Sequence, residues 1–199
     1  MAAARRPLTS RTPADGPPLS YRAFVPPEGC HRRPLVLVHG HRSRANRQKG
    51  LGVPLIAPVF PADRFARYQT LAGTDGPLAA LNAFVGTLED ASSHLQVATD
   101  RVDMLGFSGG AQFVHRFAML EPSRVLRAVV VAAGWYTYLD EDRPFPRGTG
   151  RSGQTGGRSI DVVGFLNLPV HVLVGERDIE RDRNLRPDAG STGDKVRDG

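Results

Sequence analysis

Short apolar runs recur along the chain, and most are followed directly by glycine, proline or polar residues. They lie at residues 34–38, 53–59, 102–105, 128–133 and 169–174. Runs of four to eight mostly apolar residues are typical of strands buried on both faces of a parallel sheet. Pro54 and Pro58 confine the regular part of the second run to a few residues. A further short strand is predicted at residues 21–25, before Pro26-Pro27.

Between these runs the apolar positions change to a helical spacing. Gly76-Pro77 opens one helical pattern that continues to His94, and residues 111–120 form a second pattern, stopped by Pro122. Strands that alternate with helices predict an open, mostly parallel α/β sheet with helices on both faces. Ligands bind such sheets at the carboxyl ends of the strands. The link from Gly40 to Val53 is short for a parallel crossover, which usually needs about a dozen residues including a helix.

Length and composition favour one globular domain. The chain has 199 residues, of which 40% are hydrophobic and 23% charged. Residues 1–20 are rich in Pro, Arg, Ala and Ser and are expected to form a disordered arm. Residues 21–185 are expected to form the folded domain, and residues 186–199 a disordered tail, because the end of the chain has almost no apolar residues.

The charge pattern changes this picture little. The net charge of +6 comes from scattered arginines, without basic and aromatic residues interleaved, so a solvated surface is favoured over nucleic-acid binding. The N-terminus lacks the apolar core of a signal peptide, and no run approaches the roughly 20 residues that span a membrane. The single cysteine, Cys30, excludes an internal disulfide and fits a reducing compartment, and nothing near it suggests a metal site. We therefore expect a cytoplasmic protein with no membrane or nucleic-acid partner.

The candidate chemistry centres on Gly106-Phe107-Ser108-Gly109-Gly110, between a predicted strand and a predicted helix. A G-x-S-x-G in this position is typical of a nucleophile elbow, a tight turn that holds a serine hydroxyl above the sheet. The alternative is a chance match, which the flanking strand and helix disfavour. The backbone N–H of Gly109 points to where an oxyanion would form. The second predicted donor is the N–H of His41, whereas His39 is expected to shape its loop.

Asp178 is the candidate acid, because it follows the last predicted strand within Val174-Gly175-Glu176-Arg177-Asp178. A carboxylate there can orient an imidazole. A surface carboxylate in a charged turn is an equally good interpretation of Asp178, and Asp182 is a neighbouring alternative.

With these motifs in this order, together with Leu37-Val38-His39-Gly40, the chain resembles the α/β-hydrolase family, in the neighbourhood of esterases and polyester depolymerases. The resemblance covers roughly residues 21–185. It implies a serine hydrolase acting on carboxylic esters or similar acyl bonds of a small-molecule substrate, with a Ser–acid–His triad and no metal or cofactor.

The chain departs from the family pattern because no histidine follows Asp178. The six histidines all precede it, at positions 31, 39, 41, 94, 115 and 171. His171 is expected to be packed within a strand, and His115 to face core or solvent. The last strand and helix of the family are also missing, which leaves an apolar edge and predicts self-association. The alternative hypothesis is an inactive relative or truncated gene product that acts as a binding module.

The loop from Gly134 to Asp161 lies where the family keeps its substrate-facing insert. Its aromatic residues could line an acyl pocket or pack the loop onto the sheet, and the sequence leaves both interpretations open; they are Trp135, Tyr136, Tyr138 and Phe145.

Overall fold

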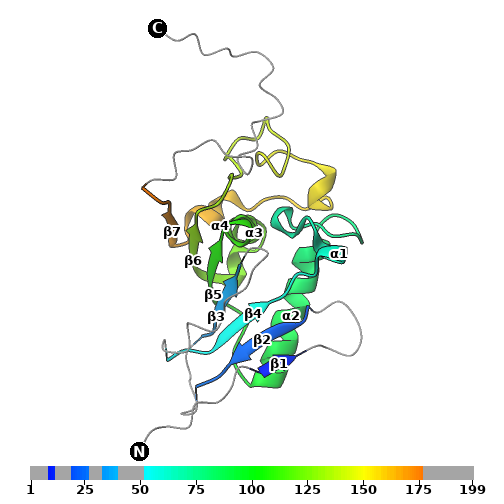
Figure 1. Cartoon of the computed structure of the whole chain (residues 1–199). Helices are drawn as coiled ribbons and strands as arrows, with labels where there is room; N and C mark the ends of the chain where they lie inside the picture. The colour runs from blue at the N-terminus through cyan, green and yellow to red at the C-terminus, as the bar shows by residue number, and fades with distance from the viewer. Residues whose placement is uncertain (1–8, 12–18, 27–32, 40–51, 177–199) are drawn as a thin grey trace, which may run out of the picture.

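A single twisted sheet of seven strands runs through the computed structural model, which describes residues 9–11, 19–26, 33–39 and 52–176 (Figure 1). Along the sheet the strands follow the order β1-β2-β4-β3-β5-β6-β7. Their bounds are β1 (Thr9–Arg11), β2 (Tyr21–Phe24), β3 (Leu35–Val38), β4 (Leu55–Pro58), β5 (Val102–Phe107), β6 (Val125–Val131) and β7 (Val170–Leu173).

The central part of the sheet is parallel, as the apolar runs predict. Strands β4, β3, β5, β6 and β7 are parallel neighbours, whereas β2 is antiparallel to both β1 and β4. The register places Val38 of β3 beside Gly106 of β5, and Gly106 beside Val130 of β6. The carboxyl ends of these three strands therefore meet at the same edge of the sheet, where the candidate site is predicted.

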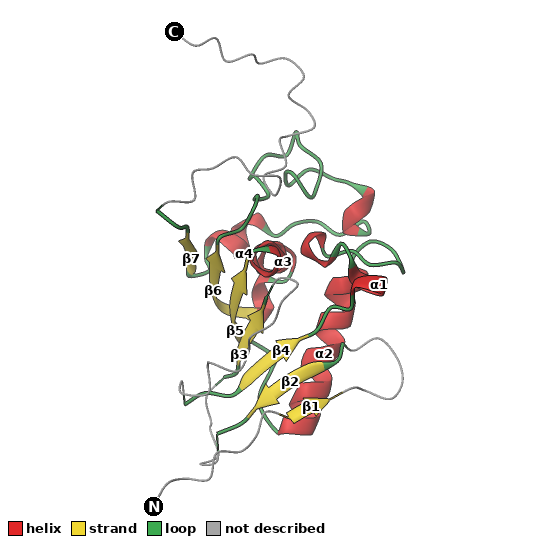
Figure 2. Ribbon diagram, viewed as in Figure 1, coloured by secondary structure: helices red, strands yellow, loops and turns green. Residues whose placement is uncertain are grey.

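The two long helices are α2 (Ala79–Leu95) and α3 (Gly109–Leu120) (Figure 2). Helix α2 begins after Leu78, two residues later than Gly76-Pro77 suggests, because Leu78 has a left-handed backbone with φ 60°. Two short helices were not expected from the sequence, α1 (Ala62–Phe65) and α4 (Val162–Leu166). Three single turns complete the list: η2 (Tyr68–Thr70), η3 (Pro122–Arg124) and η4 (Gly153–Thr155).

The main core fills one face of the sheet. Val36, Val38 and Met104 point from the strands to this face, where they meet Phe84 of α2 and Phe113 of α3. The opposite face carries a small cluster made of strand residues and Val53. Further along that face, Arg127 of β6 forms an ion pair with Asp103 of β5. Helices on both faces of the sheet were expected. The described helices that have residues in a core cluster all contribute to the main core, on one face of the sheet.

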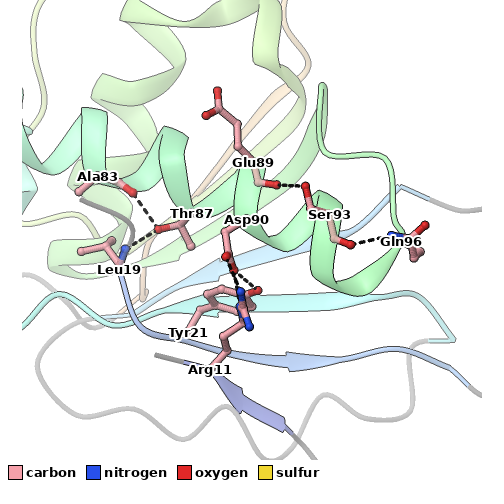
Figure 3. A network of polar contacts seen from close by, with 9 residues as sticks. All are labelled: Arg11, Leu19, Tyr21, Ala83, Thr87, Glu89, Asp90, Ser93 and Gln96. Atoms are coloured by element: carbon pink, nitrogen blue, oxygen red, sulfur yellow. Dashed lines mark hydrogen bonds and ion pairs between the residues drawn. The ribbon is translucent and has the colours of Figure 1, made fainter. Parts of the chain in front are cut away.

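The expectation of a disordered arm over residues 1–20 is wrong for two parts of it. Thr9–Arg11 forms β1, and Leu19 is buried with its N–H bonded to Thr87 Oγ1 at 2.7 Å. In Figure 3 the Arg11 guanidinium donates two hydrogen bonds to Asp90 of α2, and Tyr21 Oη donates a third at 2.7 Å. The Arg11 hydrogen bonds, more than any other contact, hold the pKa of Asp90 below its usual range. Strand β1, which has no apolar run of its own, is thus held to α2 by an ion pair.

Strand β7 lies at the edge of the sheet and is the least covered strand. Val172, Leu173 and Val174 are at least half exposed, and His171 is exposed as well. The expectation that His171 is packed is therefore wrong, because β6 is the only described strand that pairs with β7. An exposed apolar edge favours association, and self-association of this chain stays a prediction.

None of the described helices combines the length and the apolar character that crossing a membrane requires.

We predict that Tyr21→Phe lowers the free energy of unfolding by about 1.5 kcal/mol, because it removes a hydrogen bond to a charged acceptor from a fully buried ring. Urea denaturation at neutral pH measures the change. Tyr138→Phe is the matched control, since Tyr138 is 54% exposed and should change stability by less than about 0.5 kcal/mol. Equal effects of the two substitutions would contradict the role assigned to the Arg11–Asp90–Tyr21 network.

Candidate active site

Ser108 lies at a sharp turn between β5 and α3, as the motif predicts. Strand β5 ends at Phe107 and α3 begins at Gly109, so that Ser108 alone forms the turn. Its backbone has φ 54° and ψ −119°, a conformation that costs a residue with a side chain on the order of 1–3 kcal/mol. The Ser108 N–H donates to Val131 O at 2.9 Å, which ties the turn to the end of β6. The side chain is exposed.

Two glycines allow this turn because α3 lies directly against the strands. A Cβ on Gly110 would collide with the backbone carbonyl of Val38 in β3, and a Cβ on Gly106 would collide with the backbone of Gly110. Backbone therefore packs against backbone on both sides of Ser108. The glycine spacing of the motif is a steric requirement of the way the helix meets the sheet.

Tyr68 connects the turn to the end of β3. Its hydroxyl donates to the carbonyl oxygen of His39 at 3.3 Å, and a Cβ on Gly109 would lie 2.7 Å from the same hydroxyl. Burial raises the pKa of Tyr68 to about 12, so that it stays a neutral donor at ordinary pH. The sequence analysis missed this residue, because Tyr68 lies 40 positions before Ser108 in a short turn without a recognisable motif.

The predicted partners of Ser108 are not all placed. His41, Asp178 and its alternative Asp182 lie outside the described residues, so the structure tests neither the second oxyanion donor nor the acid. Gly109 is the first residue of α3, directly after Ser108, and its role as an oxyanion donor stays a prediction. The N-terminus of a helix carries a partial positive charge, which favours negative charge at this position.

None of the described histidines forms a hydrogen bond with Ser108 Oγ. His94 is exposed near the end of α2, and His171 is exposed on β7. His39 is half buried, and its carbonyl accepts the bond from Tyr68. Within residues 9–11, 19–26, 33–39 and 52–176, no histidine is therefore paired with Ser108 as a base.

His115 faces the core, one of the two orientations expected for it. Its ring packs edge-on against Tyr136 and Phe165, at centroid distances of 5.6 and 5.7 Å. Within the described structure its Nδ1 has no hydrogen-bond partner. Burial, and to a smaller extent the neighbouring charge of Arg116, lowers the pKa of His115 to about 4. It is therefore a neutral packing residue at physiological pH.

The aromatic residues of the 134–161 insert take different roles. Phe145 is fully buried, and Tyr136 packs against the main core, so both attach the insert to the domain. Tyr138 is exposed, with the Arg143 guanidinium 5.2 Å from its ring centroid. Trp135 is partly buried, and its ring centroid lies 3.9 Å from the guanidinium carbon of the buried Arg116. The packing interpretation holds for Tyr136 and Phe145.

Among the described residues, no group of three or more His, Cys, Asp or Glu side chains is placed so that it could hold a metal ion.

Comparison with known proteins identifies the fold. No protein-family model matches the chain, and no curated protein matches it in sequence. Among solved structures, poly(aspartic acid) hydrolase-1 from Sphingomonas sp. KT-1 is similar with a TM-score of 0.66 and 22% identity, over 92% of this chain and 76% of that one. A poly(3-hydroxybutyrate) depolymerase from Bordetella parapertussis has a TM-score of 0.60 and 21% identity, over 81% of this chain.

A third similar structure is a fluorophosphonate-binding serine hydrolase from Staphylococcus aureus, with a TM-score of 0.55 and 14% identity, over 85% of this chain and 79% of that one. The chain spans 61% of the length of the Bordetella depolymerase. Together with the strand order and the turn at Ser108, these similarities establish the α/β-hydrolase fold.

We predict that Gly110→Ala lowers the free energy of unfolding by about 3 kcal/mol, because its methyl group forces α3 away from β3. Urea denaturation measures the change. Gly153→Ala is the matched control, since a Cβ there meets nothing within 4 Å and should change stability by less than about 1 kcal/mol. A small effect of Gly110→Ala would contradict the close approach of α3 and β3.

Protonation of His115 should destabilise the fold in acid. Its pKa is lower in the folded state (about 4) than in the unfolded state, so the unfolded state gains protons first as the pH falls below about 6.5. Stability is therefore lost between about pH 6.5 and 4, with about 2.5 kcal/mol lost by pH 4.5. His115→Phe should remove this loss, measured as the difference between urea denaturation at pH 7 and at pH 4.5. Replacement of the exposed His94 by Gln should leave it in place, and equal pH dependence of His115→Phe and wild type would disprove the assignment.

Proposed function

We propose that this chain is a serine hydrolase that cleaves carboxylic esters or similar acyl bonds, with Ser108 as the nucleophile. The observation that carries the proposal is the exposed hydroxyl on strained backbone between β5 and α3. Strain of this kind clusters at reactive sites and persists only where the surrounding structure holds it. The fold adds support, because the three similar structures described above are named as two hydrolases and a depolymerase.

In the proposed reaction, Ser108 Oγ attacks the carbonyl carbon of the ester while a base takes the hydroxyl proton. Negative charge then develops on the carbonyl oxygen, where the N–H groups of Gly109 and His41 are the proposed donors. The bond to the alcohol oxygen breaks, and the base returns the proton to the leaving alcohol. Water next attacks the acyl-serine, which releases the acid and restores Ser108. Asp178 is the proposed partner that orients the base.

The alternative function is that of a catalytically inactive relative that binds ligands without turnover. One observation favours it: none of the described histidines reaches Ser108 Oγ. The two hypotheses differ in the rate that Ser108 supports. A cytoplasmic location and the absence of a nucleic-acid partner remain predictions from the sequence.

We expect very low turnover of p-nitrophenyl acetate and butyrate by the chain. Removal of the histidine alone costs a serine hydrolase on the order of 10⁶ in turnover, whereas binding and the oxyanion hole can retain roughly 10³–10⁴ over water. Any rate above this residual level should be abolished by Ser108→Ala and unchanged by replacement of the exposed Ser123 with Ala.

Three results would change these conclusions. Equal rates above the residual level for wild type and Ser108→Ala would refute the assignment of Ser108 as the nucleophile, whereas equal rates at the residual level would favour the inactive alternative. A turnover of about 1 s⁻¹ or more that disappears in Ser108→Ala would demonstrate a working base, and would exclude the inactive alternative.

A further inference from the structure

The buried guanidinium of Arg116 joins three separate segments beside the candidate site. Arg116 lies on α3, two helical turns after Ser108, and is fully buried. Its Nη1 donates to the carbonyl oxygen of Gln69 in η2 at 2.8 Å and to that of Gln112 in α3 at 3.2 Å. Its Nε donates to Thr137 Oγ1 in the insert at 3.1 Å. One side chain therefore connects η2, α3 and the first part of the insert.

The same guanidinium stacks on the insert. Its central carbon lies 3.9 Å from the ring centroid of Trp135, and Arg147 approaches the same ring at 5.8 Å. Such cation–π contacts are strongest where the cation is desolvated. Thr137 Oγ1 donates onward to the carbonyl oxygen of Pro146 at 2.7 Å. The chain from Arg116 thus reaches both the beginning and the later part of the loop at residues 135–147.

The charge of Arg116 is not neutralised within the described structure. No described carboxylate forms an ion pair with it, and its Nη2 has no hydrogen-bond partner there. Burial lowers its pKa to about 9, which still leaves the group protonated at neutral pH. A buried cation without a counter-ion is costly, and an apolar residue would pack at lower cost. This cost suggests that Arg116 does more than fill space.

The segments that Arg116 joins are connected to the turn at Ser108. Tyr68, next to Gln69 in η2, contacts the end of β3 and lies against Gly109. The insert begins just after β6, whose last residue, Val131, accepts the hydrogen bond from the Ser108 N–H. Movement of η2 or of the insert would therefore act on the residues that hold Ser108 in place, Gly109 through Tyr68 and the Ser108 N–H through the end of β6.

We propose that Arg116 is a positioning residue that holds the insert wall, residues 135–147, against η2 and so sets the shape of the substrate site at Ser108. The proposal rests on the proposed hydrolase function. The planar fork of the guanidinium is essential to this role, because it donates in fixed directions to three segments at once. A lysine in its place would keep the charge but could not make these bonds together.

We call the contacts of Arg116 with η2 and with residues 135–147 the clamp. Fluorescence and hydrogen exchange test the clamp without requiring enzymatic activity. Trp135 is the only tryptophan of the chain, so its emission reports directly on the stack with Arg116. We expect Arg116→Met and Arg116→Lys to raise acrylamide quenching of Trp135 about twofold, and to speed amide exchange in residues 135–147 about tenfold, while β5 and β6 stay protected. The exposed Arg22→Met is the matched control and should match wild type.

A milder variant keeps the test valid if Arg116→Met fails to fold. Thr137→Val preserves shape but removes both hydrogen bonds of the Thr137 hydroxyl, and should give a smaller change in the same two measurements. Unchanged quenching and exchange in the folded variants would overturn the clamp. Full rescue of both by Arg116→Lys would also overturn it, since charge alone would then suffice. Loss of protection spread equally over β5, β6 and the insert would instead indicate a purely structural core residue.

Kinetics connect the clamp to the site. If wild type hydrolyses p-nitrophenyl butyrate, Thr137→Val and Arg116→Lys should raise KM about tenfold with a smaller change in kcat, because the wall positions substrate without entering the chemistry. Local loosening with unchanged KM and kcat would overturn the positioning role. Local loosening in the variants, combined with a wild type that shows no Ser108-dependent hydrolysis, would refute the proposed function and leave the clamp standing.

Discussion

The direct contact between the backbone of α3 and that of the central strands is the constraint on which the candidate site depends. Because Gly106 and Gly110 have no side chains, α3 can start against Val38 of β3 and hold Ser108 in its strained conformation. Every residue of α3 from Gly110 to Leu120 is buried, so the helix cannot shift without disturbing the main core. The geometry at the serine is thus imposed by the packing of the helix, which holds the strain in place.

Helix α3 also carries two buried polar side chains with different charge states. His115 is neutral at physiological pH, because burial and the nearby charge of Arg116 both disfavour its protonated form. Arg116 keeps its charge, since its basicity remains high even after burial and since its bonds to η2 and the insert partly replace water. The two neighbours contact adjacent residues of the insert, His115 meeting Tyr136 and Arg116 meeting Trp135. One helix therefore fixes both the serine and the loop next to it.

The sequence predicted the parts of the fold that follow from local patterns. Apolar runs identified the parallel strands, and glycine spacing around Ser108 identified the turn, because both leave a periodic or steric signature in nearby residues. Strand β1 was missed because charge, through Arg11 and Asp90, replaces the apolar pattern. Tyr68 and Arg116 were missed because their partners lie far away in the sequence, and His171 was placed wrongly because periodicity does not distinguish an edge strand from a central one.

The residue at position 108 itself favours a chemical role for the site. At φ 54° and ψ −119° a glycine would be nearly free of strain, and glycines already occupy positions 106, 109 and 110 around it. If the turn served only to connect β5 to α3, a glycine at position 108 would do so at lower cost. The chain instead holds a hydroxyl there and exposes it to solvent. The cost of the strain is understandable if the Ser108 hydroxyl has a chemical role. The exposed position of this hydroxyl therefore carries more weight for function than the incomplete set of partners described around it.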